Sequence, residues 1–223
     1  LAHEKTGLVP SEEWARTKRR ARWYPSETIS VSIGQGPLLM TPLQIGRAVS
    51  ALATGGKLPT PHLFFASQDP KTGVRLRYRA QPRQSLSIDP ALLGIVKNGM
   101  WAVLNEPGGT AFGSRVPGVD AGGKTGTVQV ASRDAVARPG VDRRLLEDHA
   151  WFTAFAPIDD PKIVVVVFVE HGGHGSDAAA PVARRLLAKF FGVEVAPRPG
   201  EPGFVTASTR TAGVRPAASE VSP

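Results

Sequence analysis

The chain has 223 residues, of which 41% are hydrophobic and 21% charged, which fits one globular domain and excludes disorder throughout. It contains no cysteine, so disulfides, thiolate metal sites and cysteine nucleophiles are excluded. Its 27 Lys and Arg against 19 Asp and Glu give a net charge of +8, which predicts an anionic partner such as nucleic acid, acidic lipid or a cell-wall polymer.

Two short clusters, residues 16–22 and 75–83, hold much of this positive charge. Neither is interleaved with the stacking aromatics and glycines of an RNA-binding sheet, so we expect no nucleic-acid partner. No stretch has the length of a membrane span, and the amino terminus lacks a signal-peptide pattern. Because Leu1 is not a methionine, we expect an internal start, with targeting signals upstream in a longer protein.

Residues 1–33 show no regular pattern and predict an irregular basic arm that packs a few aromatics. A helix is expected next, because residues 41–44 read Thr-Pro-Leu-Gln, a capping box with Pro at the first helical position; Gly55 and Gly56 would end it. Residues 74–79 read Val-Arg-Leu-Arg-Tyr-Arg, so every second residue is an arginine. This period of two, with the arginines outward, predicts a solvent-facing strand or hairpin arm. Asp89 and Pro90 then begin a second helix, which Glu106 and Pro107 end.

The second half of the chain predicts three strands and a helix. Residues 122–130 form a glycine-rich edge strand, and 150–155 form the next strand after a charged excursion at 132–148. Residues 163–169 are apolar on both pleats, so we expect them inside a sheet with helices above and below. A helix over 178–191 should stop at Gly192, and the Pro-, Ala- and Ser-rich residues after Val195 should be disordered.

The tripeptide Lys-Thr-Gly occurs three times, beginning at Lys5, Lys71 and Lys124. The first two copies predict turns, because Gly and Pro surround them. Only the third leads into a strand, and Lys-Thr-Gly is one of the motifs of penicillin-binding proteins and class A β-lactamases. The alternative interpretation is a plain strand beside a Gly-rich turn.

In the third copy, glycines 122, 123 and 126 present no Cβ to a second backbone, so an extended peptide could add to the strand edge. Strand alternation predicts Thr125 and Thr127 on one pleat, facing a ligand carboxylate together, and Lys124 and Gly126 on the other. Lys124 would supply positive charge, and the Thr127 N–H is a candidate oxyanion donor.

Residues 170–174, Glu-His-Gly-Gly-His, place two histidines three apart. A third metal ligand and a helical register are missing, so we expect a flexible loop between a strand and a helix and no metal site. His62 and His149 are interpreted as structural, although His149 begins a strand beside the proposed cleft.

Five segments in this order resemble class B penicillin-binding proteins, most of all those of the penicillin-binding protein 2 type. The segments are 27–44, 105–110, 123–130, 149–157 and 170–181. The resemblance implies an α+β fold, an antiparallel sheet with helices on both faces, like that of serine β-lactamases but incomplete. It implies that residues 1–195 are the carboxyl-terminal part of a transpeptidase domain and that 196–223 are a disordered tail. Because the family sheet takes its first two strands from before the nucleophile, we expect residues 163–169 to have an unpaired apolar edge here.

The resemblance also implies a peptidoglycan D,D-transpeptidase that works through a serine acyl-enzyme. Lys124, Thr125, Gly126 and Thr127 would bind the D-Ala-D-Ala stem peptide, with Lys124 and the Thr127 N–H counted as catalytic and no cofactor required. Implied partners are peptidoglycan stem peptides, β-lactam antibiotics and membrane proteins of the elongation complex, including a glycosyltransferase. The implied location is the extracytoplasmic (periplasmic) side of the bacterial inner membrane.

No serine in the chain is followed by Lys at the third position, and Ser-x-Asn is absent. Covalent catalysis needs a nucleophile beside its base, so we expect these residues alone to be inert. A D,D-carboxypeptidase or a β-lactamase would share the Lys-Thr-Gly strand. A non-catalytic peptidoglycan-binding or scaffold module is the alternative from a different functional class.

Overall fold

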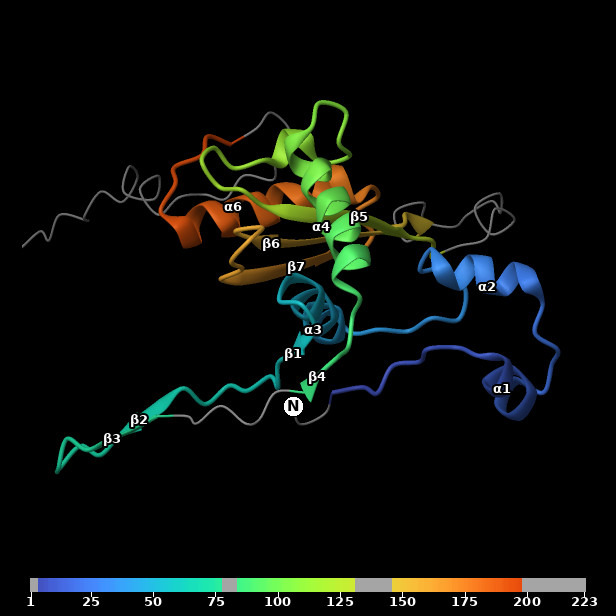
Figure 1. Ribbon diagram of the computed structural model, residues 1–223, viewed down its shortest axis with the longest axis horizontal. Coiled ribbons are helices and arrows are strands. Elements are labelled where there is room, and N and C mark those ends of the chain that lie inside the picture. The colour runs from blue at the N-terminus through green and yellow to red at the C-terminus, as the bar shows by residue number, and fades with distance from the viewer. Residues whose placement is uncertain (1–3, 78–83, 131–145, 198–223) are drawn as a thin grey trace, which may run out of the picture.

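The computed structural model describes residues 4–77, 84–130 and 146–197 (Figure 1). The predicted excursion at 132–148 and the predicted tail at 196–223 therefore lie almost entirely outside the described residues. The helical elements are α1 Glu12–Trp14, η1 Ala15–Arg19, α2 Pro25–Ser32, α3 Pro42–Ala53, α4 Pro90–Asn105, η2 Phe112–Ser114, η4 Gly175–Ala179 and α6 Ala180–Phe191. The strands are β1 Lys57–Leu58, β2 Ala66–Gln68, β3 Arg75–Arg77, β4 Gln84–Ser85, β5 Gly122–Val128, β6 His149–Ala156 and β7 Ile163–Val169.

The main sheet of the described chain is antiparallel, in the order β5-β6-β7. Thr125 of β5 lies opposite Phe152 of β6, and Phe152 lies opposite Val167 of β7. Figure 1 shows α6 and α3 on opposite sides of this sheet. The predicted α+β architecture, an antiparallel sheet covered on both faces, is confirmed.

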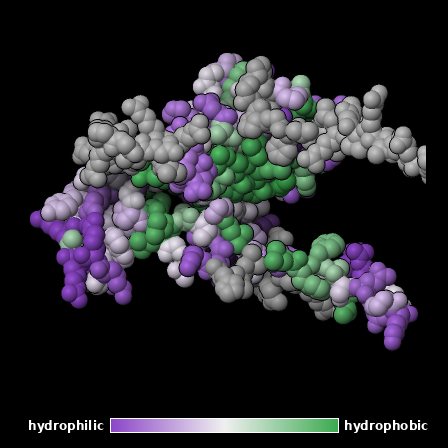
Figure 2. Space-filling model, turned by 180° about the vertical axis from the view of Figure 1, so that it is seen from behind, coloured by the Kyte–Doolittle hydropathy of each residue, from purple (hydrophilic) through white to green (hydrophobic). Residues whose placement is uncertain are grey.

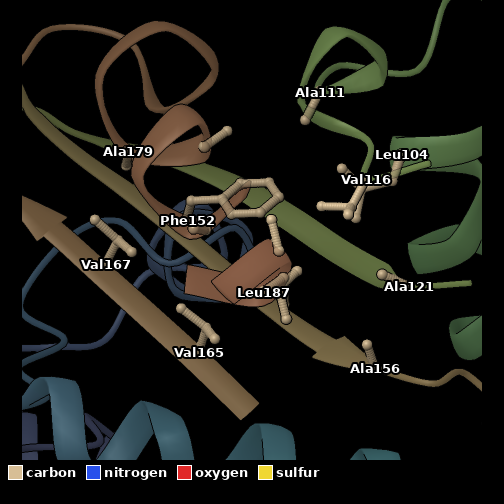
Figure 3. Packing of buried hydrophobic residues seen from close by; sticks show 14 of the residues in the cluster. Leu104, Ala111, Val116, Ala121, Phe152, Ala156, Val165, Val167, Ala179 and Leu187 are labelled. Atoms are coloured by element: carbon tan, nitrogen blue, oxygen red, sulfur yellow. The ribbon is translucent and has the colours of Figure 1, made fainter. Parts of the chain in front are cut away.

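The core lies on both faces of β6, because this strand alternates between two apolar clusters. On the α6 face, the buried Phe152 ring lies among side chains of α6 and β7 (Figure 3). On the α3 face, Phe155 packs with Val49 and Met100. Since Phe152 and Phe155 are essentially inaccessible to solvent, the register of β6 fixes which pleat of β5 faces each helix.

β7 has helices on both faces, as its apolar sequence predicts, but it is the last strand of the described sheet and not an inner one. Its free edge includes Phe168, which is exposed. An apolar strand with an unpaired edge invites pairing with further polypeptide or aggregation.

Both predicted helix starts are confirmed. The Thr41 hydroxyl accepts a hydrogen bond from the Gln44 N–H, and the Gln44 side-chain oxygen accepts one from the Thr41 N–H. Helix α3 therefore begins with a complete capping box. The Asp89 carboxylate accepts the Ala91 N–H at the start of α4. Gly192 ends α6 with a φ of 69°, as predicted.

The prediction of an irregular arm over residues 1–33 is wrong, because α1, η1 and α2 lie there. The Glu27 carboxylate accepts the Tyr24 N–H at 2.9 Å at the start of α2 and also pairs with Arg19. The Arg19 hydrogen bond, followed by the Tyr24 N–H, lowers the pKa of Glu27 to about 2. The contact that organises this arm thus joins residues eight apart, which local patterns do not reveal.

The strand predicted at 74–79 is confirmed at 75–77 as β3, and residues 78 and 79 lie outside the described residues. β3 pairs with β2 in a two-stranded arm that extends away from the sheet (Figure 1). Both arginines of β3 are exposed, and so is Leu76 between them. No helix among the described residues has the length and apolar character that a membrane crossing requires.

Candidate functional site

The edge of β5 is the candidate site, because in the described sheet β5 pairs with β6 alone. Lys124 is exposed, and Thr125, Gly126 and Thr127 are half-buried. Helix α4 packs against the start of the strand, at Gly122 and Gly123, and among the described residues no second strand pairs with β5 from Lys124 onward. The four predicted residues therefore lie together on an accessible strand edge and not in a sealed interior.

The pairing of β5 with β6 assigns each side chain to a pleat. Thr125 and Thr127 lie opposite Phe152 and Ala150, and so share one pleat, whereas Lys124 lies opposite Thr153 on the other. The predicted alternation is correct. The two hydroxyls and the ammonium thus flank the same edge from its two sides.

Two hydrogen bonds identify which backbone groups of β5 point away from β6. The Lys124 ammonium donates to the Thr125 carbonyl at 2.7 Å, and the Gln35 side-chain amide donates to the Thr127 carbonyl at 3.2 Å. In an antiparallel strand the N–H and C=O of one residue point to the same side, and successive residues point to opposite sides, so Thr125 and Thr127 share a side. The N–H groups of Thr125 and Thr127 therefore face the open edge.

The Thr125 hydroxyl has a second hydroxyl beside it. Thr110, in the exposed turn after α4, places its Oγ1 at 3.2 Å from the Oγ1 of Thr125. Each hydroxyl can donate or accept, so the pair orients the Thr125 side chain at the edge.

The strand glycines serve the protein's own packing. A Cβ at Gly122 would lie 2.8 Å from Ile158, and one at Gly123 would lie 2.7 Å from the Phe152 ring. Gly126 packs on Trp151, and a Cβ at Gly175 of η4 would lie 2.7 Å from the Gly126 oxygen. The prediction that the glycines leave room for a second backbone is therefore wrong for Gly122 and Gly123, where core side chains fill that space.

The other Lys-Thr-Gly copies have no such setting. At Lys71 the tripeptide is a turn, as predicted, in which the Asp69 carboxylate accepts the Lys71 and Thr72 N–H groups. These bonds lower the pKa of Asp69. At Lys5 it is an irregular segment and not the predicted turn, and the Gln44 side chain bonds its carbonyls.

His149 begins β6 opposite Val128, at the carboxyl end of β5. His171 follows β7, and its N–H donates to the His149 ring at 3.0 Å, so His149 has the structural contact that the sequence predicts for it. Among residues 4–77, 84–130 and 146–197, no three His, Cys, Asp or Glu side chains come together in a way that could hold a metal. A hollow of ≈ 880 Å³ lies at the amino-terminal arm, and no residue of β5 lines it; its lining is residues 12, 13, 16 and 20–23.

Three residues at this edge did not emerge from the sequence as site residues, namely Gln35, Thr110 and Gly175. All three fall in segments that carry the family resemblance, and that resemblance was the one sequence signal that could have marked them as site residues. The contacts of Gln35 and Thr110 to β5 span 92 and 15 residues of sequence, so no local pattern predicts them.

Residues 1–188 match the protein family described as "Penicillin binding protein transpeptidase domain". The "Peptidoglycan D,D-transpeptidase MrdA" of Haemophilus influenzae is 38% identical over 201 residues, covering 86% of this chain and 30% of the relative. The protein of the same name from Salmonella typhimurium is 35% identical over 196 residues, covering 86% and 31%. The chain thus spans about a third of the length of the curated relatives it matches.

Solved structures agree with these relatives. A structure of Pseudomonas aeruginosa PBP2 in complex with WCK 5153 superposes with a TM-score of 0.66 at 34% identity, covering 85% of this chain and 39% of that one. A complex between Helicobacter pylori PBP2 and MreC superposes with a TM-score of 0.68 at 29% identity, covering 86% and 32%.

Proposed function

The chain belongs to the penicillin-binding protein transpeptidase family, with relatives of the penicillin-binding protein 2 type, and on that premise we propose that β5 binds the D-Ala-D-Ala end of a peptidoglycan stem peptide. The observation that supports this most is the open edge of β5, with Lys124 exposed and the Thr125 and Thr127 backbone groups facing outward. A peptide that pairs with this edge gains main-chain hydrogen bonds.

Each site residue has a role in this proposal. The Thr125 and Thr127 hydroxyls and the Lys124 ammonium hold the terminal carboxylate, since charge-assisted hydrogen bonds to a carboxylate are stronger than neutral ones. Gly126 contributes backbone alone. The Thr127 N–H completes an oxyanion hole for the scissile carbonyl.

In the whole protein the reaction needs a serine outside these 223 residues, because none here has the Ser-x-x-Lys spacing. That serine oxygen bonds to the carbonyl carbon, the C–N bond to the last residue breaks, and D-Ala leaves with the proton. An amine of a neighbouring peptidoglycan strand then attacks the acyl carbon, the bond to the serine oxygen breaks, and the serine oxygen takes the proton that the amine loses. These residues alone supply the binding edge and no nucleophile.

Exposed apolar side chains support the idea that this part of the transpeptidase domain packs on further polypeptide. Ile95 of α4 is 68% exposed and Ile33 beyond α2 is 74% exposed. Figure 2 shows apolar surface gathered at the centre of one face of the molecule. Exposed apolar patches of this kind mark interaction sites. We propose that residues 1–195 are part of one transpeptidase domain, with 196–223 as a tail.

We assign the assembled protein to the extracytoplasmic side of the bacterial inner membrane, as the family resemblance implies. Its proposed partners are stem peptides, β-lactams and membrane proteins of cell elongation, including a glycosyltransferase. The net charge of +8 suits an anionic cell-wall polymer.

Fluorescent penicillin tests the division of labour between the chain and the missing serine. We expect no covalent label on the 223-residue chain, with a full-length penicillin-binding protein as the positive control. In parallel, backbone amide signals of β5 should shift when an N-acetylated peptide ending in D-Ala-D-Ala is added. The same peptide with a carboxamide end is the control and should leave them unchanged. Labelling of the chain would contradict the missing nucleophile, and absent shifts would favour the scaffold alternative.

Thr110 gives a further prediction, because its hydroxyl orients that of Thr125. Thr110→Val, which keeps the side-chain shape, should weaken peptide binding about threefold, the effect of one hydrogen bond. Thr110→Ser keeps the hydroxyl and should bind like the parent. Calorimetric titration measures both, and equal binding by the Val and Ser variants would rule out this role.

A further inference from the structure

Two carbonyls on the open edge of β5 already accept hydrogen bonds from the protein's own side chains. The carbonyls of Thr125 and Thr127 point to the same side of the strand, and each accepts a hydrogen bond from a side chain, Lys124 at 2.7 Å and Gln35 at 3.2 Å. A peptide that adds to this edge must offer its own N–H groups to the same carbonyls. Binding therefore requires these side-chain donors to leave.

Lys124 and Gln35 differ in what they can do after leaving. The Lys124 ammonium can turn to a ligand carboxylate, so its contact with Thr125 is exchanged for a stronger one. Gln35 carries a neutral amide and comes from a distant part of the chain, 92 residues from Thr127 in sequence. Its amide N–H is chemically the same donor that a peptide backbone presents.

The backbone of Gln35 is fixed by the end of α2. Its N–H donates to the Ser30 carbonyl at 2.9 Å, and the Gly34 N–H donates to the Val31 carbonyl at 3.0 Å. These two bonds, with Gly34 at a φ of 80°, form a Schellman motif, the common glycine-dependent helix ending. The motif fixes the Gln35 backbone, and the end of α2 lies near the carboxyl end of β5 (Figure 1), so the Gln35 side chain reaches the Thr127 carbonyl.

We propose that Gln35 is a competitive cap on the peptide-binding edge: its side-chain amide takes the place of the peptide N–H at the Thr127 carbonyl and must swing away before a stem peptide binds. This inference rests on the proposed function of β5 and adds regulation of that same site. The cap also explains how the Thr127 carbonyl at an accessible strand edge keeps a hydrogen-bond partner without a ligand. It lowers the apparent affinity for peptide by the fraction of molecules in which the edge is capped.

Two substitutions test the cap on the complete 223-residue chain. Gln35→Ala removes the amide, and Gln35→Met keeps the length without a donor. Both leave the Gln35 N–H bond to Ser30 in place, so α2 should be retained. Because one intramolecular hydrogen bond is lost from the free state only, both variants should bind the D-Ala-D-Ala peptide about threefold more tightly. Gln68→Ala on the exposed β2 is the matched control and should bind like the parent.

The titrations distinguish failure of the Gln35 cap from failure of the proposed peptide site on β5. Tighter binding by both Gln35 variants supports the cap. Unchanged or weaker binding by either variant, with the parent still binding, overturns the cap and leaves the β5 site standing. Absence of binding by the parent and all variants overturns the β5 site itself, and the cap with it.

Discussion

Gly175→Ala is expected to destabilise the protein by about 3 kcal/mol or more, the upper range for overpacking a core. A Cβ at this position would lie 2.3 Å from the Trp151 oxygen and 2.7 Å from the Gly126 oxygen. Both atoms belong to the backbone of the central sheet, so neither can rotate away. Relief requires η4 to move off β5 and β6, which disturbs the strand between Thr125 and Thr127.

Gly94→Ala is the matched control for that substitution. Gly94 lies within α4, where a Cβ would meet nothing within 4 Å. The same chemical change should there stabilise the protein by about 0.5–1 kcal/mol, because alanine is the better helix former. Urea unfolding followed by circular dichroism measures both. A Gly175→Ala protein as stable as the parent would show that η4 does not pack closely on Gly126 in solution.

Lys124→Gln is expected to weaken binding of the D-Ala-D-Ala peptide about tenfold. A hydrogen bond to a charged group contributes about 1.5–3 kcal/mol, and the low end applies at an exposed edge where solvent screens the charge. The ammonium has one partner on the strand now, the Thr125 carbonyl, and it exchanges this partner for the peptide carboxylate. Calorimetric titration at two salt concentrations measures the loss.

Lys57→Gln on β1 removes the same charge at an exposed position outside the site. It should change binding less than twofold and so separates a specific contact from the general attraction of a basic protein. Raising the salt concentration should weaken binding by the parent and have less effect on Lys124→Gln. Equal losses for the two lysine variants would contradict the role given to Lys124.

Short-range signals in the sequence were sufficient for much of the fold. The starts of α3 and α4 depend on a capping side chain and a proline within four residues, and the end of α6 depends on a single glycine. The alternation of β5 and the cover on both faces of β7 follow from side-chain periodicity alone. Each of these predictions is confirmed, because each feature depends on residues that are close together in sequence.

The errors have a common origin. α2 depends on Glu27, which binds both Tyr24 and the more distant Arg19. The apolar pattern of β7 predicts an inner strand, whereas the described sheet ends at β7, as the family resemblance implies for this part of the chain. Gly122 and Gly123 were assigned to a ligand, whereas Ile158 and Phe152 use their space. A glycine in the sequence does not reveal whether a ligand or the protein's own side chains occupy the space beside it.

The sequence by itself determined the starts of α3 and α4, the end of α6, the pleat on which each β5 side chain lies and the absence of a Ser-x-x-Lys pair, since these need only local spacing. Tertiary structure alone decided which strand edge is open, which carbonyls point outward and which side chains bond to them. The physical reason is that Gln35 meets Thr127, and Thr110 meets Thr125, only after the packing of α3, α4 and α6 on the sheet brings distant segments within hydrogen-bonding distance.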